Sequence, residues 1–311
     1  MYHVIMNPSA SSGKGAKVWE YVKERLENEQ IEYEAHCMKS AKDTVRLVKN
    51  LTAVDNWHGE DHNIIVLGGD GTLNTVLNGI EDMEHTILSC IRTGSGNDFA
   101  RNMGISKRVE EALEGILHHS DDMLLDYGVV EYEGEQRKGV RRFLISSGIG
   151  YDADICEEVS RSRLKKRLNR IHLGKLVYVA IGIKQIFTRH SVEATVIMDE
   201  EQEIHVPALF FGVGMIHPME GGGVPFCPRA NPQDGMLDVC LVKVMSRLKL
   251  LTAVMLVYAK QHFVFRAITE HRCRSLTITT ETPQWFHMDG ETPCKVQSVK
   301  LHCESGLRFR M

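Results

Sequence analysis

The sequence lacks the cysteine and histidine spacings that mark common zinc sites. Its eight cysteines are scattered, no two form a CxxC pair, and the HExxH pattern is absent. A structural or catalytic zinc site is therefore not expected. With no export signal, cysteines scattered along a 311-residue chain are expected to be reduced thiols and not a disulfide framework.

Long hydrophobic runs and a bulk positive charge are also missing. The most apolar stretch, residues 250–259, is far shorter than the roughly 20 residues needed to span a bilayer. The first six residues have no basic start and no long apolar run, so no signal peptide is expected. A formal net charge of −4 argues against a nucleic-acid-binding protein.

The composition that remains is that of a globular protein. Hydrophobic residues make up 43% and charged residues 25% of the chain, which excludes a long disordered, collagenous or coiled-coil protein. A length of 311 residues exceeds what one hydrophobic core usually supports. We therefore expect two domains.

The first third of the chain alternates strands and helices. Short apolar runs predict strands, and runs with apolar residues on one helical face predict helices. Such alternation predicts an α/β domain with a parallel sheet covered by helices on both faces. The expected strands are Tyr2–Met6, Tyr33–Cys37, 63–67 and 86–91, and the expected helices are 16–26, 43–51, 72–80 and 109–117.

After residue 125 strand-like runs dominate, separated by Gly, Pro and Asp clusters. This pattern predicts a mostly antiparallel β domain with helical interruptions near 154–187 and 247–258. The expected strands are 128–132, 142–147, 192–198, 204–213, 237–244, 275–280, 285–288 and 295–301. We place one domain at 1–127 together with 302–311, and the other at 128–301.

The strongest local signal is the run Gly68-Gly69-Asp70-Gly71-Thr72 between a buried strand and a helix. Glycines let the backbone approach a ligand closely, and a helix start offers N–H groups that suit phosphate. Asp70 would repel a bare phosphate, so it is expected to help hold Mg²⁺ or to orient neighbouring groups. The alternative is a tight turn in which Asp70 caps its own helix.

Two more small-residue turns follow predicted strands. They are residues 7–15 (NPSASSGKG) and 93–98 (TGSGND), and neither is a Walker A loop because GxxxxGK[ST] is absent. Alone, each would be an ordinary loop. All three turns follow strands of one predicted parallel sheet, so they should gather at its carboxyl edge, where ligands bind in open α/β sheets.

Two acidic turns lie in the second half of the chain. Asp234 and Asp238 stand in NPQDGMLD, for which spacing alone favours a plain hairpin turn. Asp289-Gly290-Glu291, here called the DGE motif, offers two carboxylates beside a flexible glycine. One of them could serve as a general base, or both could stand in a solvated turn.

These motifs, in this order and approximate spacing, resemble the diacylglycerol kinase catalytic-domain family, which includes bacterial lipid kinases and is related to sphingosine and ceramide kinases. The resemblance rests on NPSASSGKG, GGDGTLN, GSGND, NPQDGMLDV and MDGE and extends over essentially the whole chain. It implies an α/β nucleotide-binding domain and an antiparallel β-sandwich domain, with ATP in the cleft between them. The chain has Arg92-Thr93 where the family commonly has Pro-Leu or Pro-Ala.

The resemblance also implies site residues. Asp234 matches a Mg²⁺ ligand position, helped by the carbonyls of Asn231 and Met236, and Asp126 matches a recurring supporting acid. The DGE motif supplies the proposed base; we favour Glu291 for its longer reach, with Asp289 supporting Mg²⁺ and Asp70 ordering the phosphate loop. The implied nucleotide-site positions are Asn7, Pro8, Ser11, Gly13, Gly68, Gly69, Asp70, Gly71, Thr72, Asn74, Ser95, Asn97 and Asp98.

A run of basic residues precedes an apolar, acid-free stretch that reaches to Glu193. Such a segment could dock on anionic lipid, or it could be a solvated charge run before a packed helix. The six basic residues are Arg161, Arg163, Lys165, Lys166, Arg167 and Arg170.

Together these features predict an ATP- and Mg²⁺-dependent lipid kinase that phosphorylates a lipid hydroxyl, with diacylglycerol giving phosphatidic acid as the favoured reaction. We expect it in the cytoplasm, peripheral to the inner face of the membrane, with a homodimer as an option and no nucleic-acid partner. One alternative is a kinase of a soluble hydroxyl compound, as in NAD kinases. The other is a non-catalytic nucleotide- or lipid-binding regulator.

Overall fold

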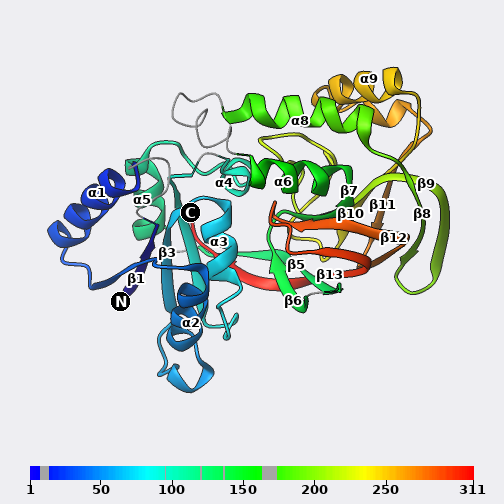
Figure 1. The fold of residues 1–311 in the computed structure, drawn as a ribbon. Helices are drawn as coiled ribbons and strands as arrows, with labels where there is room; N and C mark the ends of the chain where they lie inside the picture. Colours follow the sequence, from blue (N-terminus) through cyan, green and yellow to red (C-terminus); the bar gives the residue numbers. More distant parts are fainter. Residues whose placement is uncertain (8–13, 95, 120, 136, 163–173) are drawn as a thin grey trace. The chain divides into compact units, whose positions relative to one another are not determined.

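A computed structural model describes residues 1–7, 14–94, 96–119, 121–135, 137–162 and 174–311, which form two compact units (Figure 1). The first unit contains Met1–Asp126 and Ser305–Met311, and the second contains Tyr127–Glu304. These bounds lie within three residues of the predicted ones. Tyr127 and Glu304 belong together in the second unit, where the Tyr127 hydroxyl donates a 2.6 Å hydrogen bond to the Glu304 carboxylate.

The first unit is built on a sheet of parallel strands. Strands β1 (Tyr2–Met6), β2 (Tyr33–Cys37), β3 (His62–Gly68) and β4 (Thr86–Arg92) lie in the order β2-β1-β3-β4, and each adjacent pair is parallel. Beyond β4, Phe309 from the end of the chain pairs with Leu88, also in parallel. Strands β3 and β4 are almost entirely buried, which agrees with the apolar runs that predicted them.

Helices cover this sheet in two pairs. Arg25 of α1 forms an ion pair with Glu114 of α5, so these helices lie side by side. On the other face α2 packs against α3, where a side chain at Gly79 would collide with Val48 of α2 (Figure 1). The helices of this unit are α1 (Lys14–Asn28), α2 (Ala41–Leu51), α3 (Asp70–Leu77), α4 (Asp98–Asn102), α5 (Val109–His118) and the 3-10 turn η2 (Val54–Asn56).

The second unit is antiparallel and closes on itself. The long strands β9 and β12 each pair with β7 over one part of their length and with β8 over another. The four strands therefore enclose a core that includes Val196, Phe286 and Leu301. The strands are β5 (Met123–Glu133), β6 (Lys138–Phe143), β7 (Ser146–Gly150), β8 (Val192–Met198), β9 (Gln202–Met215), β10 (Leu237–Lys243), β11 (Ile268–Cys273), β12 (Ser275–Met288) and β13 (Lys295–Phe309). Residues 123–126 of β5 and 305–309 of β13 belong to the first unit.

Two strand predictions in this unit are wrong. The predicted strand 142–147 is divided between β6 and β7, because the backbone N–H groups of Leu144, Ile145 and Ser146 donate to the Asp289 carboxylate and not to a neighbouring strand. The predicted strands 275–280 and 285–288 are one strand, β12, with a shift of register between Thr279 and Gln284. Strand β11 and helix α4 were not predicted.

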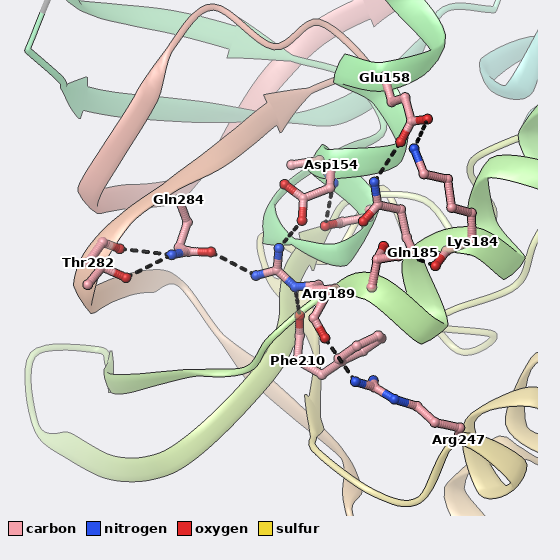
Figure 2. Close-up of polar contacts among 12 residues, drawn as sticks. Asp154, Glu158, Lys184, Gln185, Arg189, Phe210, Arg247, Thr282 and Gln284 are labelled. Atoms are coloured by element: carbon pink, nitrogen blue, oxygen red, sulfur yellow. Dashed lines mark hydrogen bonds and ion pairs between the residues drawn. The ribbon is translucent and has the colours of Figure 1, made fainter.

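Helices α6 (Tyr151–Arg161), α8 (Gly174–Thr188) and α9 (Arg247–Tyr258), with the 3-10 turn η3 (His262–Val264), complete the second unit. Arg189, at the end of α8, joins several of these elements (Figure 2). Its guanidinium forms an ion pair with Asp154 of α6 and donates at 2.9 Å to the Phe210 carbonyl and to Gln284 of β12. Arg247 of α9 donates to the Arg189 carbonyl at 3.1 Å.

Removal of the Arg189 guanidinium is expected to destabilise the second unit strongly. Its side chain is only 4% exposed, so Arg189→Met would leave Asp154 without its charged partner in a buried place. We expect a loss of about 3–5 kcal/mol in the free energy of unfolding. Lys300→Met, which breaks an exposed ion pair with Glu200, should cost under about 1 kcal/mol. Urea unfolding measures both, and equal losses would contradict the anchoring role.

Candidate functional site

Three turns meet at the carboxyl ends of β1, β3 and β4. The Asn7 N–H donates to the Leu67 carbonyl at 3.2 Å, and the Thr93 N–H donates to the Gly68 carbonyl at 2.8 Å. The Asn7 amide also reaches the Thr72 hydroxyl at 3.5 Å. The first unit therefore brings the start of the first turn, the GGDGT turn and the TGSGND turn together at one edge of its sheet.

The glycines of these turns allow backbone to lie on backbone. A Cβ atom built on Gly94 would lie 2.6 Å from the Cα of Gly69, and one built on Gly68 would lie 2.5 Å from the Cβ of Thr72. A side chain at Gly94 would push the two turns apart, and one at Gly68 would collide with Thr72 within the GGDGT turn. The two glycine turns thus form one packed layer at the start of α3.

Asp70 joins the GGDGT turn to the TGSGND turn through its carboxylate. Its oxygens accept hydrogen bonds from the backbone N–H groups of Asp98 and Phe99 at 2.9 and 3.0 Å. Asp70 therefore caps the start of α4 and not that of α3, the helix on which it lies. The expectation that Asp70 orients neighbouring groups fits this geometry.

Polar atoms without partners lie beside this carboxylate. Asn97 has a left-handed backbone (φ 54°), and its amide N–H donates to the Gly94 carbonyl at 2.6 Å. Its oxygen Oδ1 and the hydroxyl of Thr93 are buried and have no hydrogen-bond partner among the described residues. Unsatisfied buried polar atoms are costly, and a bound ligand would satisfy them. The Thr93 hydroxyl and the first N–H groups of α3 are donors that fit a phosphate group, whereas the Asn97 oxygen is an acceptor that fits a donor such as a hydroxyl of the ATP ribose.

Two more of the predicted nucleotide residues use their side chains in contacts within the protein. Asn74 is fully buried, and its side-chain oxygen accepts a hydrogen bond from Asn78 one turn later. Asp98 pairs with Arg101 of the same helix. Pro8, Ser11, Gly13 and Ser95 lie outside the described residues.

Asp126, the predicted supporting acid, is buried in the first unit. It accepts a hydrogen bond from the Ser305 hydroxyl. This contact ties β5 to the returning end of the chain.

The two acids of the DGE motif have different surroundings in the second unit. The Asp289 carboxylate accepts backbone N–H groups from Leu144, Ile145 and Ser146 at 2.8, 2.8 and 3.1 Å. Its own backbone is left-handed, with φ 45°. The Glu291 side chain is 48% exposed and lies 3.4 Å from the Arg141 guanidinium. Asp289 is thus used to build the turn, whereas Glu291 extends from it.

A buried charge pair lies next to the DGE motif, and no motif in the sequence indicated it. His287 Nε2 lies 2.9 Å from Asp152 Oδ2, and the Gly290 N–H points to His287 Nδ1 at 3.4 Å. The buried Glu220 accepts from the Ser146 hydroxyl in the same region. Burial lowers the pKa of His287, but the charge of Asp152 and its hydrogen bond outweigh burial and raise that pKa to about 9.

The predicted metal turn contains a second acid, Asp238, to which the resemblance assigned no role. Asp234 Oδ1 accepts the Met236 N–H at 3.1 Å, and its other oxygen pairs with Arg272. Four residues on, Asp238 is buried, and neither oxygen has a hydrogen-bond partner among the described residues, although Arg272 Nε lies 3.6 Å away. Burial, reinforced by Asp234, raises the pKa of Asp238 to about 6.

Replacing Gly94 tests the packed layer of glycine turns. Gly94→Ala places a methyl group against the Gly69 backbone, so we expect it to lower the thermal midpoint of the first unit. Gly71→Ala is the matched control, because its Cβ would meet nothing within 4 Å and helix propensity favours Ala by up to about 1 kcal/mol. If the two variants melt alike, the close approach of the turns is not a structural requirement.

Asp152→Asn tests the buried charge pair through its pH dependence. His287 titrates near 6.5 when unfolded and near 9 when folded, so its stabilisation is complete below pH 6.5 and is lost as pH rises through 9. The variant should be less stable than the parent by about 3 kcal/mol at pH 6, and the gap should narrow above pH 9. Urea midpoints at both pH values measure the gap. A gap independent of pH would contradict the assignment.

Family models of known proteins match both units of the chain. Residues 1–125 match the family model described as the diacylglycerol kinase catalytic domain. Residues 145–304 match the one described as the YegS C-terminal NAD kinase beta sandwich-like domain. A solved structure described as a candidate diacylglycerol kinase from Bacillus anthracis str. Sterne has the same fold, with a TM-score of 0.74, 19% identity, and coverage of 99% of this chain and 96% of that one.

Relatives of similar length carry lipid kinase names. YtlR of Bacillus subtilis strain 168, named as a candidate lipid kinase, is 27% identical over 94% of this chain and 95% of its own. A YegS-like candidate lipid kinase of Stenotrophomonas maltophilia strain K279a is 30% identical over 82% and 79%. A diacylglycerol kinase of Mycobacterium tuberculosis H37Rv is 23% identical over 93% and 88%. The chain therefore belongs to the diacylglycerol kinase catalytic-domain family, with a YegS-type C-terminal domain, and is a kinase that uses ATP.

Proposed function

We propose that the enzyme transfers the γ-phosphoryl group of ATP to the hydroxyl of a lipid, with diacylglycerol as the acceptor and phosphatidic acid as the product. Several relatives that match most of the chain are named diacylglycerol kinases, which supports this acceptor. The observation that carries the lipid assignment is an exposed apolar face on α8 and α9. A kinase of a soluble hydroxyl compound would have no use for it.

The apolar face comes from two helices that lie side by side (Figure 1). Val179, Ile183 and Phe187 repeat every four residues along α8, so they share one side of the helix, and all three are exposed. Leu248 and Met255 of α9 are each about three-quarters exposed. Apolar patches of this kind on a protein surface mark sites of interaction with proteins or membranes.

The charge around this face favours an anionic membrane as its partner. No Asp or Glu occurs in residues 159–192, which include α8, or in residues 239–269, which include α9. Lys249, Lys260 and Arg266 are exposed in the second of these segments. Apolar side chains flanked by cations and no acids are the combination that binds an anionic lipid surface. We therefore place the enzyme at the inner face of the membrane, where cytosolic ATP meets the lipid.

Membrane contact through this face does not depend on a spanning segment. Among the described residues, no helix is both long and apolar enough to cross a bilayer. Of the six basic residues first considered for docking, Arg161 pairs with Glu157 and lies 5.6 Å from the Trp285 ring centre. The other five lie outside the described residues.

In the first unit, the packed glycine turns are the proposed phosphate site. Asp70 fixes the TGSGND turn against the GGDGT turn, so backbone N–H groups are held in place before ATP binds. Preorganised N–H groups stabilise negative charge that develops during phosphoryl transfer without a cost of reorganisation. The Thr93 hydroxyl adds a donor that the described residues leave unsatisfied, and the Asn97 oxygen adds an unsatisfied acceptor for a hydroxyl or amino group of the nucleotide.

In the second unit, we propose that Asp234 and Asp238 hold Mg²⁺ with the carbonyls of Asn231 and Met236. Oxygen is the ligand that Mg²⁺ prefers, and the unsatisfied oxygens of Asp238 are the feature that fits a cation. Mg²⁺ would neutralise negative charge there. Arg272 forms ion pairs with both carboxylates and so holds the turn that contains Asp234.

Glu291 is the proposed base that accepts the proton of the lipid hydroxyl. A general base must reach the proton that it removes, and Glu291 is the acid of the DGE motif whose side chain is open to solvent. Asp289 meets three backbone N–H groups and so positions the turn. The buried ion pair of His287 and Asp152 lies beside the same turn, because His287 stands two residues before Asp289.

Glu291→Gln keeps the size of the side chain and removes its ability to accept a proton. We expect kcat to fall by about 10²–10⁴-fold, with the KM for ATP nearly unchanged, in a steady-state kinase assay. Asp289→Asn should instead lower the thermal midpoint, because an amide has one acceptor atom for three N–H groups. A mild Glu291→Gln beside a stable but inactive Asp289→Asn would move the role of base to Asp289.

An acceptor screen tests the proposed reaction. ATP consumption is measured with diacylglycerol, phosphatidylglycerol and sphingosine in mixed micelles, and with NAD in solution. We expect turnover with a lipid, highest with diacylglycerol. Turnover with NAD alone would contradict the lipid assignment, and turnover with another lipid would keep the class and change the acceptor.

The apolar face is tested by replacing Ile183, Phe187 and Met255 with Ser. This triple variant should sediment less with vesicles that contain anionic phosphatidylglycerol, while its activity on a short-chain, water-soluble diacylglycerol is kept. Val54→Ser with Val140→Ser is the control, since these valines are equally exposed but lie on other elements. Equal sedimentation of the triple variant and the parent would show that the protein binds the membrane through another surface and not through the apolar face.

A further inference from the structure

Three side chains on the first two strands of the first unit converge on one point. The parallel register pairs His3 of β1 with Glu34 of β2, and it pairs Ile5 with His36. Residues two apart on a strand share a face of the sheet, so His3, Glu34 and His36 lie on the same face. The closest atoms are His3 Nδ1, Glu34 Oε2 and His36 Nε2.

The spacing of these atoms is that of ligands around a metal ion. The two imidazole nitrogens are 3.3 Å apart, and they lie 3.5 and 3.7 Å from the Glu34 oxygen. Hydrogen bonds that involve nitrogen usually measure about 2.7–3.2 Å, so all three contacts are long for hydrogen bonds. Tetrahedral zinc with bonds of about 2.0–2.2 Å places its ligand atoms about 3.3–3.6 Å apart, which matches the observed triangle.

The surroundings of the triangle favour a metal over a salt bridge. The two histidine side chains are only 10% and 13% exposed, while Glu34 is 58% exposed and leaves one side open to solvent. A hollow lined by Ile5, Met38 and Thr44 lies beside His36.

A second group of potential metal ligands differs from this triangle in its burial and its hydrogen bonding. Asp152, Glu220 and His287 also lie close together, and all three are buried. There, His287 is hydrogen-bonded to Asp152 at 2.9 Å, and its pKa is raised to about 9. A protonated imidazole in a satisfied hydrogen bond does not bind a metal, so this cluster is assigned to the charge pair next to the DGE motif.

We propose that His3, Glu34 and His36 bind a divalent transition metal ion, with Zn²⁺ as the best fit, and that the ion fastens the edge strand β2 to β1. Two imidazoles and a carboxylate suit Zn²⁺ and are poor ligands for Mg²⁺, so this site is distinct from the proposed magnesium turn. Water would complete the coordination from the open side. Because β1 leads directly into Asn7, the ion also steadies the strand that precedes the first turn of the phosphate site.

Metal titration of the full chain, first stripped with a chelator, tests the site. We expect calorimetry with Zn²⁺ to show one site per chain at micromolar affinity or better, and the thermal midpoint to rise with Zn²⁺. The absorption bands of Co²⁺ should show a tetrahedral site. Glu34→Gln and His36→Ala should each weaken binding by about tenfold or more.

Two controls separate this site from other histidines and acids. His118→Ala removes a half-exposed histidine on α5 that pairs with Glu29, and it should bind Zn²⁺ as the parent does. Asp234→Asn, in the proposed magnesium turn, should also keep the site. The proposal is overturned if the stripped chain shows no saturable Zn²⁺ binding. It is equally overturned if Glu34→Gln and His36→Ala, both folded by circular dichroism, bind Zn²⁺ like the parent.

Discussion

The Asp70 carboxylate, shared between two backbone N–H groups of another turn, is the contact on which the proposed phosphate site depends. It fixes the start of α4 to the start of α3, and the glycines around it allow the two backbones to touch. An acid in a site for an anion would ordinarily repel it. Here the Asp70 carboxylate accepts hydrogen bonds from the backbone N–H groups of Asp98 and Phe99. Its charge therefore holds the two turns together and is not directed at the phosphate.

Charged groups also hold the second unit together. There, buried ion pairs fix the helices and turns that carry the exposed residues of the proposed sites. Arg189, which directly follows α8, contacts α6, α9, β9 and β12 through four polar contacts, and the proposed membrane face is the outer side of α8 and α9. The pair of Asp152 and His287 lies next to the DGE motif in the same way. Buried ion pairs add little net stability, but removing one partner is costly, so each pair fixes a unique arrangement.

The sequence was most informative where local pattern decides structure. Short apolar runs that alternate with helical patterns predicted β1, β3 and β4, and their shared parallel sheet brings the described parts of the three turns to one edge, as expected. The strand 142–147 was wrong because Asp289, more than 140 residues away, takes its N–H groups. No window of sequence contains that information.

The same limit explains the site residues that motifs did not reveal. His287 and Asp152 are separated by 135 positions, and only the fold makes them partners. His3 and His36 escaped a search for zinc spacings because they belong to two strands, and their closeness follows from the register of β1 with β2. Asp238 was seen in its motif, but only burial shows that its oxygens lack partners.

Backbone hydrogen exchange in the presence of a non-hydrolysable ATP analogue tests the central claim most directly. If the joined glycine turns bind the phosphates, amides in residues 68–72 and 94–99 should exchange more slowly when the analogue is bound, and Asp70→Asn should reduce that protection. If the analogue binds, as shown by calorimetry, while exchange in both turns stays unchanged, the phosphates lie elsewhere and the account of Asp70 is wrong.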